Sequence, residues 1–385
     1  MSESGTGGVS THSAYVPALD GIRGVAIIWV VLHNATDMSF VPQRGVLQLL
    51  YLLAHPGWIG VQLFFALSGF LITAGLLGTQ GSPHYFRNFY ARRALRILPL
   101  YYAVLSALLV VAPRIWLQWP FNTHEQASLW LFTINWTHTA PYGFAHFWSL
   151  AVEEQFYLLW PLLVYKLAPR RLFAVCVGIS LGALLLRCVM VRWGADPWTI
   201  YTATACRMDA LALGGAAACL LHMPQRRAWI ANRTNALAVG GVALFLAGIP
   251  VTHLYDRWTW AGETIGYTLL AICSATVVIA AALPEARPRS AAARLLSLAP
   301  LRSIGKYSYA MYIFHGLLHK LLGEPWLIAR FGKTPPVAAV LLYSLVLLTV
   351  TYALAAVSYY TVEERFLALK ERFESSGRAR PVVAA

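Results

Sequence analysis

Ten apolar stretches of this chain are each long enough to cross a bilayer as a helix. Crossing the hydrocarbon core takes about 20 predominantly apolar residues. Of the 385 residues, 58% are hydrophobic and only 12% are charged, which lies outside the usual composition of soluble globular proteins. The pattern predicts an all-α fold, a polytopic membrane helix bundle with about ten transmembrane helices. The predicted spans are residues 22–39, 58–78, 98–114, 148–167, 171–191, 203–221, 236–253, 263–283, 304–320 and 337–360.

The distribution of positive charge predicts how this bundle is oriented. Ten crossings place both termini on the same side. The loops of that side, together with the C-terminal tail, hold 20 lysines and arginines, and the opposite loops hold 7. Because loops rich in lysine and arginine stay in the cytoplasm, both termini are predicted to be cytoplasmic. The net charge of +14 forms no continuous basic stripe, so no nucleic-acid partner is expected.

The chain is predicted to hold one transmembrane domain, residues 15–366. Residues 1–14 are rich in serine, glycine and threonine and are predicted to be a flexible cytoplasmic tail, because they lack the basic and apolar regions of a cleaved signal. Residues 367–385 are predicted to be a basic cytoplasmic tail. Residues 127–136 are apolar but short, which favours a re-entrant or interfacial piece of the largest external loop. The five cysteines show no Cys-x-x-Cys spacing, and no metal site is expected.

A histidine inside the first span is the first candidate functional residue. An ionisable side chain at that depth needs a protein interior or a wet cavity around it. His33 is therefore either a functional group or a core histidine bonded to a neighbouring helix. Arg23 lies ten residues earlier, about 15 Å along a helix axis. Its alternative role is an anchor at the membrane interface.

Residues 85–99 form a basic and aromatic segment before the third span. Arg93 and Arg96 are three residues apart, so on a helix both guanidinium groups point the same way. Planar guanidinium groups hold phosphate oxygens with paired donors, which favours a phosphate site. The alternative is a positively charged segment that contacts anionic lipid.

Two adjacent carboxylates lie near the start of the fourth span. Glu153 and Glu154 point about 100° apart on a helix, so at least one of them is expected to face the bundle interior. There it requires a cation or a protonated state.

Later spans carry two more polar groups. Arg207 and Asp209 begin the sixth span and are either substrate contacts or a structural ion pair with other helices. Tyr309, Tyr312 and His315 follow one another at intervals of three residues, so they form one polar stripe on one helical face. Such a stripe is predicted to line a site.

Five runs of sequence, in order along nearly the whole chain, are similar to motifs of the bacterial integral-membrane acyltransferase-3 family. They are Leu19–Gly24, Gly60–Ile72, Arg93–Pro99, Trp148–Tyr157 and Gly305–His315. The resemblance implies a ten-helix protein of the bacterial inner (plasma) membrane that transfers an acyl group, usually acetyl, from a coenzyme A thioester to a hydroxyl. The acceptor is commonly a sugar of a surface glycan or of a glycosylated small molecule.

The first-helix motif departs from the family pattern. The family usually has an arginine or lysine, ten residues, and then the histidine, whereas nine residues separate Arg23 from His33 here. A ten-residue offset leaves the two side chains about 80° apart around a regular helix. A direct partnership between them would require a local bulge or an Arg23 outside the regular helix.

Acyl transfer to an alcohol requires a base, stabilisation of the tetrahedral oxyanion and a site for the large anionic donor. We expect His33 to be the general base, and Glu153 to orient the imidazole or to bind acceptor hydroxyls. Arg93 and Arg96, with Arg23 beside them, are expected to hold the phosphates of acetyl-CoA. The expected substrate contacts are Glu154, Arg207, Asp209, Tyr309, Tyr312 and His315.

Two alternatives stay open. Ser68 is a candidate covalent nucleophile, although a Ser-Gly pair in an apolar helix more often permits close packing. The chain is alternatively a secondary transporter or flippase that uses its intramembrane histidine, glutamate and arginine residues as a proton or substrate pathway. A transporter has no need of the Arg-x-x-Arg segment and would not consume acetyl-CoA.

Overall fold

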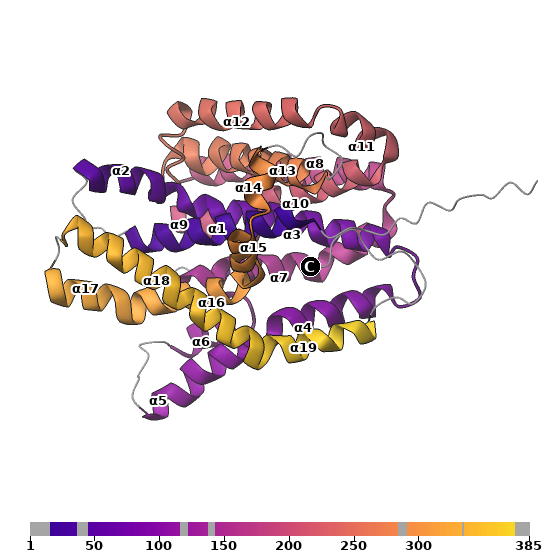
Figure 1. Cartoon of the computed structure of the whole chain (residues 1–385). Coiled ribbons are helices and arrows are strands. Elements are labelled where there is room, and N and C mark those ends of the chain that lie inside the picture. Colours follow the sequence, from indigo (N-terminus) through magenta and orange to yellow (C-terminus); the bar gives the residue numbers. More distant parts are fainter. Residues whose placement is uncertain are drawn as a thin grey trace, which may run out of the picture.

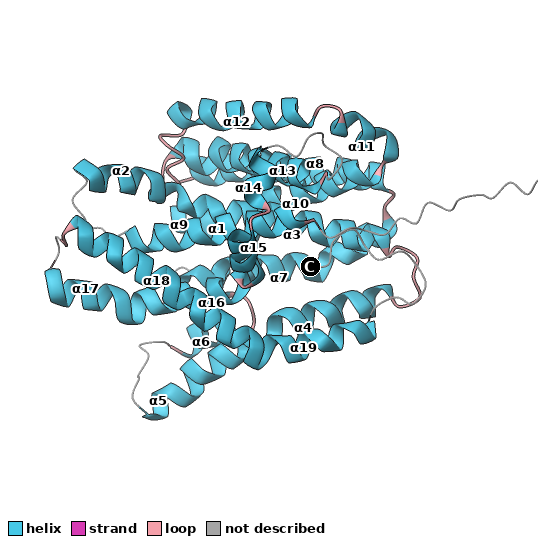
Figure 2. Ribbon diagram, in the orientation of Figure 1, coloured by secondary structure: helices cyan, strands magenta, loops and turns pink. Residues whose placement is uncertain are grey.

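The computed structural model describes residues 16–36, 45–115, 122–137, 143–283, 291–332 and 335–373. These residues form helices joined by turns and loops, with no strand among them (Figure 2). The all-α prediction is therefore confirmed. The predicted N-terminal tail, residues 1–14, and the last part of the predicted C-terminal tail, residues 374–385, lie outside the described residues.

Within the described ranges, eight helices are long and apolar enough to cross a membrane, and each overlaps a predicted span. They are α1 (Pro17–Thr36), Pro56–Gly78 with α3 (Ile59–Gly78), Tyr85–Arg114 with α4 (Tyr85–Leu105), α8 (Pro169–Arg192), Pro197–His222 with α9 (Pro197–Thr202) and α10 (Thr204–His222), α12 (Thr234–Val251), Gly262–Ala282 with α13 (Tyr267–Ala282), and Val337–Phe373 with α18 (Val337–Ser358) and α19 (Glu364–Ala368).

The two other predicted spans fall on α7 (Trp148–Lys166) and α16 (Ser308–Leu318). Helix α7 has 19 residues, but its two glutamates and its terminal lysine reduce its apolar character. Helix α16 has 11 residues and continues through a π-helical turn into α17 (Glu324–Phe331). Eight of the ten predicted spans thus have both the length and the composition of a membrane span.

Short helices connect the long ones. Residues 127–136 fall on the end of one of them, α6 (Thr123–Trp130), and on a 3-10 turn at Ile134–Trp136, both too short to span a bilayer. A capping box begins α6, because the Asn122 side chain accepts a hydrogen bond from the backbone of Glu125 at 2.8 Å. The short helices are α2 (Gly45–Ala54), α5 (Ala112–Ile115), α6 (Thr123–Trp130), α11 (Pro224–Ala231), α14 (Ala291–Leu296) and α15 (Ala299–Lys306).

The helix that starts at Tyr85 is longer than the span predicted for it. It runs from Tyr85 to Arg114, whereas the predicted span covers only residues 98–114. The basic segment before the span is therefore helical and continuous with it. At this end of the bundle α4 lies beside α19 (Figure 1). We call this part of the bundle, formed by the basic segment of residues 85–99 and by α19, the basic end.

Helices α3 and α10 touch at the centre of the bundle. A Cβ atom on Gly69 would collide with the carbonyl group of Leu211, and one on Gly214 would collide with the carbonyl group of Ala66. Without a hydrophobic driving force between helices in lipid, small residues stabilise the bundle by allowing such close backbone contact.

A fully buried ion pair ties three helices together. Arg187 of α8 lies 2.9 Å from Asp209 of α10, and neither side chain is exposed. Thr268 of α13 accepts a hydrogen bond from Arg187 at 2.6 Å and donates one to Asp209 at 3.2 Å. Asp209 thus has the structural role that was one of its two predicted interpretations, and Arg187 is its partner.

Arg207 occupies a separate buried position on α10. Its Nη2 atom donates a hydrogen bond to Gln62 Oε1 at 3.0 Å. Four aromatic rings surround the guanidinium group, with Tyr267 the nearest at 4.3 Å from ring centroid to Cζ. A cation out of water is stabilised by the negative faces of such rings. The four rings belong to Trp58, Trp148, Tyr201 and Tyr267.

Replacing Asp209 by alanine is expected to lower stability strongly, because it leaves Arg187 buried without its counter-ion. Breaking such a pair costs about 3–5 kcal/mol. The melting temperature of the detergent-solubilised protein, followed by intrinsic fluorescence, measures the effect. Arg192→Ala is the control, since Arg192 is exposed at the end of α8, the helix that carries Arg187. Equal melting temperatures for the two variants would contradict the structural role.

Candidate active site

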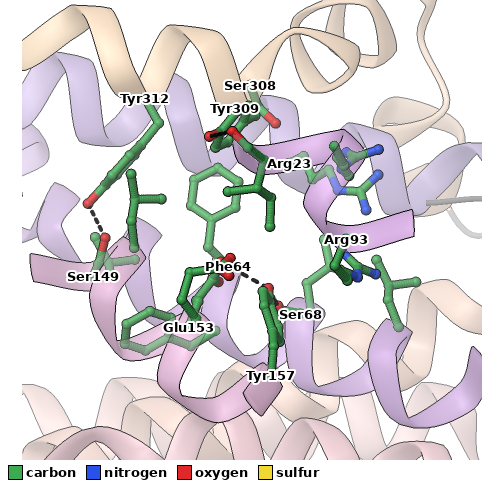
Figure 3. Close-up of a pocket in the computed structure, with 18 residues that line it drawn as sticks. Arg23, Phe64, Ser68, Arg93, Ser149, Glu153, Tyr157, Ser308, Tyr309 and Tyr312 are labelled. Carbon is green, nitrogen blue, oxygen red and sulfur yellow. Dashed lines mark hydrogen bonds between the residues drawn. The ribbon is translucent and has the colours of Figure 1, made fainter. Parts of the chain in front are cut away.

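A pocket opens between five elements near the basic end of the bundle. Its volume is about 830 Å³ when the space open to solvent is counted. Helices α1, α3, α4, α7 and α16 contribute its walls (Figure 3). Its apolar lining comes mostly from α3, and its polar lining consists of Arg23, Ser68, Arg93, Arg96, Ser149, Glu153, Glu154, Tyr157, Ser308, Tyr309 and Tyr312.

Most of the residues predicted for the site lie together in this pocket. They are Arg23, Arg93, Arg96, Glu153, Glu154, Tyr309 and Tyr312, joined by the alternative nucleophile Ser68. Four other predicted residues are not among its lining residues, namely His33, Arg207, Asp209 and His315. Arg207 and Asp209 are engaged in helix packing, so their predicted contact with substrate stays a prediction.

The arginines form one side of the pocket. Arg93 and Arg96 both line it, as their spacing predicts, and Arg23 of α1 lines it too. Figure 3 shows Arg23 and Arg93 on the same side of the pocket. Arg23 is paired with Asp20 at 2.7 Å. The guanidinium carbon of Arg93 lies 5.3 Å from the centre of the Tyr157 ring. This side of the pocket can bind an anion with planar, directional donors.

A chain of hydroxyl and carboxyl groups crosses the middle of the pocket. The Tyr157 hydroxyl donates a hydrogen bond to Glu153 Oε2 at 3.0 Å, and Ser68 Oγ lies 2.5 Å from the same hydroxyl (Figure 3). Glu154 also lines the pocket, so both carboxylates face the interior. The sequence reasoning missed Tyr157 and Ser149. The spacing of Ser149, Glu153 and Tyr157 at four-residue intervals along α7 was a signal for both.

The wall away from the arginines is formed by Tyr312 and Ser149. Their hydroxyl groups are 2.6 Å apart, and the Tyr312 hydroxyl also donates to the carbonyl oxygen of His146 at 3.0 Å (Figure 3). Tyr309 donates to the carbonyl oxygen of Ile97 at 2.7 Å, which ties α16 to α4. The polar stripe predicted for this helix thus splits, with two tyrosines in the pocket and His315 beyond it.

Beyond Tyr312 lies a cluster of polar residues that we call the outer histidine cluster: His33, Asn34, His146, Arg257 and His315. His315 Nδ1 donates to the backbone oxygen of Tyr312 at 2.7 Å, and Asn34 Nδ2 lies 3.4 Å from His315 Nε2. The rings of His146 and His315 are 4.8 Å apart between centroids. The cluster therefore continues from the far wall of the pocket.

His33 is buried in this cluster, with 4% of its surface exposed. Its Nε2 atom lies 3.3 Å from Arg257 Nη1. A guanidinium group can only donate, so Nε2 is the acceptor and the imidazole is neutral. The ring therefore keeps a basic nitrogen, as a general base requires.

Arg257 comes from a loop that sequence reasoning did not single out. Three consecutive residues before it have left-handed backbone angles: φ is 50° at His253, 61° at Leu254 and 56° at Tyr255. The loop is tied down by hydrogen bonds from Tyr255 to Phe245 at 2.9 Å and from Tyr267 to the Arg257 backbone at 3.2 Å. No helical periodicity extends into such a loop, so no sequence pattern marked Arg257.

Comparison with known proteins assigns the class of this bundle and pocket. The family model of the Acyl_transf_3 acyltransferase domain matches residues 16–356. The chain therefore belongs to the acyltransferase-3 family, as its motifs predict, and is a multi-pass protein of the bacterial inner membrane.

Three curated relatives bear the names of bacterial O-acetyltransferases. The putative peptidoglycan O-acetyltransferase YrhL of Bacillus subtilis strain 168 is 28% identical over 331 residues, 79% of this chain and 48% of the relative. The O-acetyltransferase OatA of Staphylococcus aureus strain NCTC 8325 is 27% identical over 332 residues, 78% of this chain and 50% of the relative. The peptidoglycan O-acetyltransferase OatA of Listeria monocytogenes strain EGD-e is 28% identical over 325 residues, 78% and 49% of the two chains. This chain thus spans about half the length of these relatives, and no solved structure matches it significantly.

Cysteine labelling tests the pocket without reference to catalysis. Because Ser68 lines the pocket, Ser68→Cys is expected to react with a small charged methanethiosulfonate reagent in a Cys188→Ser background. The control is Ser274→Cys, since Ser274 is only 3% exposed and lies in helix packing. Mass spectrometry of the intact protein counts the adducts. Equal modification of the two cysteines, or none at Ser68→Cys, would exclude an open pocket at this place.

Proposed function

We propose that this chain is a membrane O-acetyltransferase that transfers an acetyl group from acetyl-CoA to a hydroxyl of a carbohydrate polymer. The observation that best supports this function is the pocket in an acyltransferase domain. Arginines lie on one side of this pocket, and carboxyl and hydroxyl groups lie beyond them. The relatives named as peptidoglycan O-acetyltransferases support a cell-wall glycan as the acceptor.

The arginines are the proposed binding site for the donor phosphates. Arg93, Arg96 and Arg23 present guanidinium groups to the pocket, and such groups match phosphate oxygens with paired donors. Arg23 and His33 are about 15 Å apart along the axis of α1. An extended pantetheine arm has a comparable length. A donor whose phosphates lie at the arginines therefore brings its thioester toward Tyr312 and the outer histidine cluster.

His33 is the proposed general base. The acceptor hydroxyl takes the place of Arg257 at His33 Nε2 and gives up its proton there as its oxygen attacks the thioester carbonyl. Arg257 and Tyr312 then donate hydrogen bonds to the tetrahedral oxyanion. The C–S bond breaks, the ester remains on the acceptor, and the proton passes from His33 to the departing thiolate of coenzyme A.

Glu153 belongs to the wall of the donor channel in this proposal. Its carboxylate accepts a hydrogen bond from the Tyr157 hydroxyl, and its negative charge attracts Arg93. It therefore orients Tyr157, whose ring lies against the Arg93 guanidinium group, beside the donor. His315 is in this mechanism a group of the outer histidine cluster, 3.4 Å from the Asn34 side chain.

A transfer assay separates the enzyme from the alternative transporter. The purified protein in lipid nanodiscs is incubated with acetyl-labelled acetyl-CoA and peptidoglycan oligosaccharides. Base-labile label on the glycan supports the proposal. A folded wild-type protein that moves solute across vesicle membranes yet never transfers label would contradict the proposal.

His33→Ala is expected to lower kcat by about 10²- to 10⁴-fold, the usual contribution of a general base. The same assay measures it, and size-exclusion chromatography checks that the variant stays folded. His222→Ala is the control, because His222 is exposed at the end of α10. If His33→Ala keeps wild-type turnover, another group is the base.

The double variant Arg93→Ala/Arg96→Ala is expected to raise KM for acetyl-CoA by about 10- to 100-fold, because each lost hydrogen bond involves a charged group. Arg87→Ala is the matched control, since Arg87 lies exposed on the same helix. If KM for acetyl-CoA is unchanged in both the double variant and Arg87→Ala, the donor site lies elsewhere.

A further inference from the structure

An aromatic and basic surface lies beside the outer histidine cluster. It is formed by Trp198 and Tyr201 of α9 and by Arg257 and Trp258 of the loop between α12 and α13, and we call these four residues the aromatic platform. Helix α9 contacts the π-helical turn Gly262–Gly266 that follows the loop. In Figure 1, α9 and the connection from α12 to α13 lie away from α19. The platform is therefore not part of the basic end.

The side chains of the platform contact one another. The Cζ atom of Arg257 lies 4.8 Å from the ring centre of Trp258 and 5.1 Å from that of Tyr201. The ring centres of Tyr201 and Trp258 are 5.8 Å apart, and those of Tyr201 and Trp198 are 6.0 Å apart. Cation–π contacts and ring contacts at such distances are attractive. The four residues therefore form one surface in which the guanidinium group lies close to two rings.

Hydrogen bonds fix the backbone that carries Trp258. Asp256 Oδ1 accepts the backbone N–H of Trp258 at 3.0 Å, and the backbone oxygen of Asp256 accepts the Thr259 hydroxyl at 2.9 Å. The Thr259 hydroxyl in turn accepts the backbone N–H of Gly262 at 3.1 Å. The Trp258 residue nevertheless keeps 45% of its surface exposed. The loop thus holds a large aromatic ring in place and leaves much of it open to a ligand.

The platform leads to the proposed general base. Arg257 belongs both to the platform and to the outer histidine cluster, since its Nη1 atom lies 3.3 Å from His33 Nε2. The guanidinium group therefore bridges Trp258 and His33. A molecule that lies against the open part of the Trp258 ring is one guanidinium group away from the imidazole. Such a molecule is well placed to present a hydroxyl to His33.

An aromatic face beside a directional donor suits a sugar. One face of a pyranose ring presents C–H groups, whose partial positive charge matches the negative face of an indole. The hydroxyl oxygens around the sugar ring can accept hydrogen bonds from a guanidinium group, which only donates. A tryptophan that merely anchors a protein at the membrane interface requires no neighbouring cation. The contact between Trp258 and Arg257 therefore favours a carbohydrate ligand over a lipid.

We propose that Trp258, supported by Arg257 and Tyr201, is the stacking surface for a sugar ring of the acceptor. This inference rests on the proposed function and deepens it, because it names the residue that selects a carbohydrate over other alcohols. The sugar lies against the Trp258 ring and directs one of its hydroxyls toward His33.

The experiment measures glycan and donor separately. Wild type and variants in lipid nanodiscs are assayed for KM with peptidoglycan oligosaccharides and with acetyl-CoA, and the Kd for the oligosaccharides is measured without donor by microscale thermophoresis. Trp258→Ala is expected to raise KM and Kd for the oligosaccharides by about 3- to 10-fold, the loss of one aromatic contact. The KM for acetyl-CoA is expected to keep its wild-type value.

Matched variants separate stacking from general apolar contact. Trp258→Phe keeps an aromatic face and is expected to restore most of the glycan affinity, whereas Trp258→Leu, which is apolar but not aromatic, is expected to lose as much as Trp258→Ala. Trp260→Ala is the control, because Trp260 is 60% exposed two residues later and makes no ring or cation–π contact with other described residues. Size-exclusion chromatography checks that each variant stays folded.

Three results would overturn the inference while leaving the proposed function standing. They are unchanged glycan KM and Kd in Trp258→Ala, full glycan affinity in Trp258→Leu, and an equal loss in Trp260→Ala, which would assign both tryptophans to the membrane interface. A wild-type protein that binds the oligosaccharides through Trp258 yet transfers no label overturns the proposed function alone. A wild-type protein that neither binds nor acetylates them overturns both.

Discussion

The structure depends on one constraint: a charged side chain inside an apolar bundle has to find its partners within the protein. Helix α10 carries two such residues near its start, and each is stabilised in a different way. Asp209 neutralises Arg187 of α8 and shares Thr268 of α13 with it. Arg207 lies among aromatic rings and is bonded to Gln62 of α3. These contacts fix the neighbours of α10, and α3 in turn forms the apolar wall of the pocket.

The same constraint organises the pocket. Its polar groups run from the arginines through Glu153 and Tyr157 to Tyr312, and then into the outer histidine cluster. A donor that is anionic at one end and reactive at the other fits such a gradient, because its charged part stays at the basic end. In the proposed reaction, donor and acceptor therefore approach from opposite ends of the bundle and meet near the far wall.

The sequence predicted the helices and most of the pocket, because both depend on periodicity within single segments. Helical geometry alone predicts that Arg93 and Arg96 share a face and that at least one of the two glutamates points to the interior. The sequence pattern did not predict the contacts between segments. Packing between segments determines three such contacts: Asp209 pairs with Arg187, Arg257 reaches His33, and the C-terminal helix folds back on α4. His33 was identified as an interior residue, but its separation from the pocket lining depends on how α1 is rotated against its neighbours.

The loop that carries Arg257 has a further consequence. Left-handed backbone angles at three successive residues other than glycine are costly for the chain, and they persist only where surrounding contacts over-determine them. The conformational entropy of this loop is therefore lost when the protein folds, before any ligand binds. A loop backbone that is already rigid pays no further ordering penalty, so in the proposed reaction this corner gives the acceptor end of the bundle a preorganised geometry.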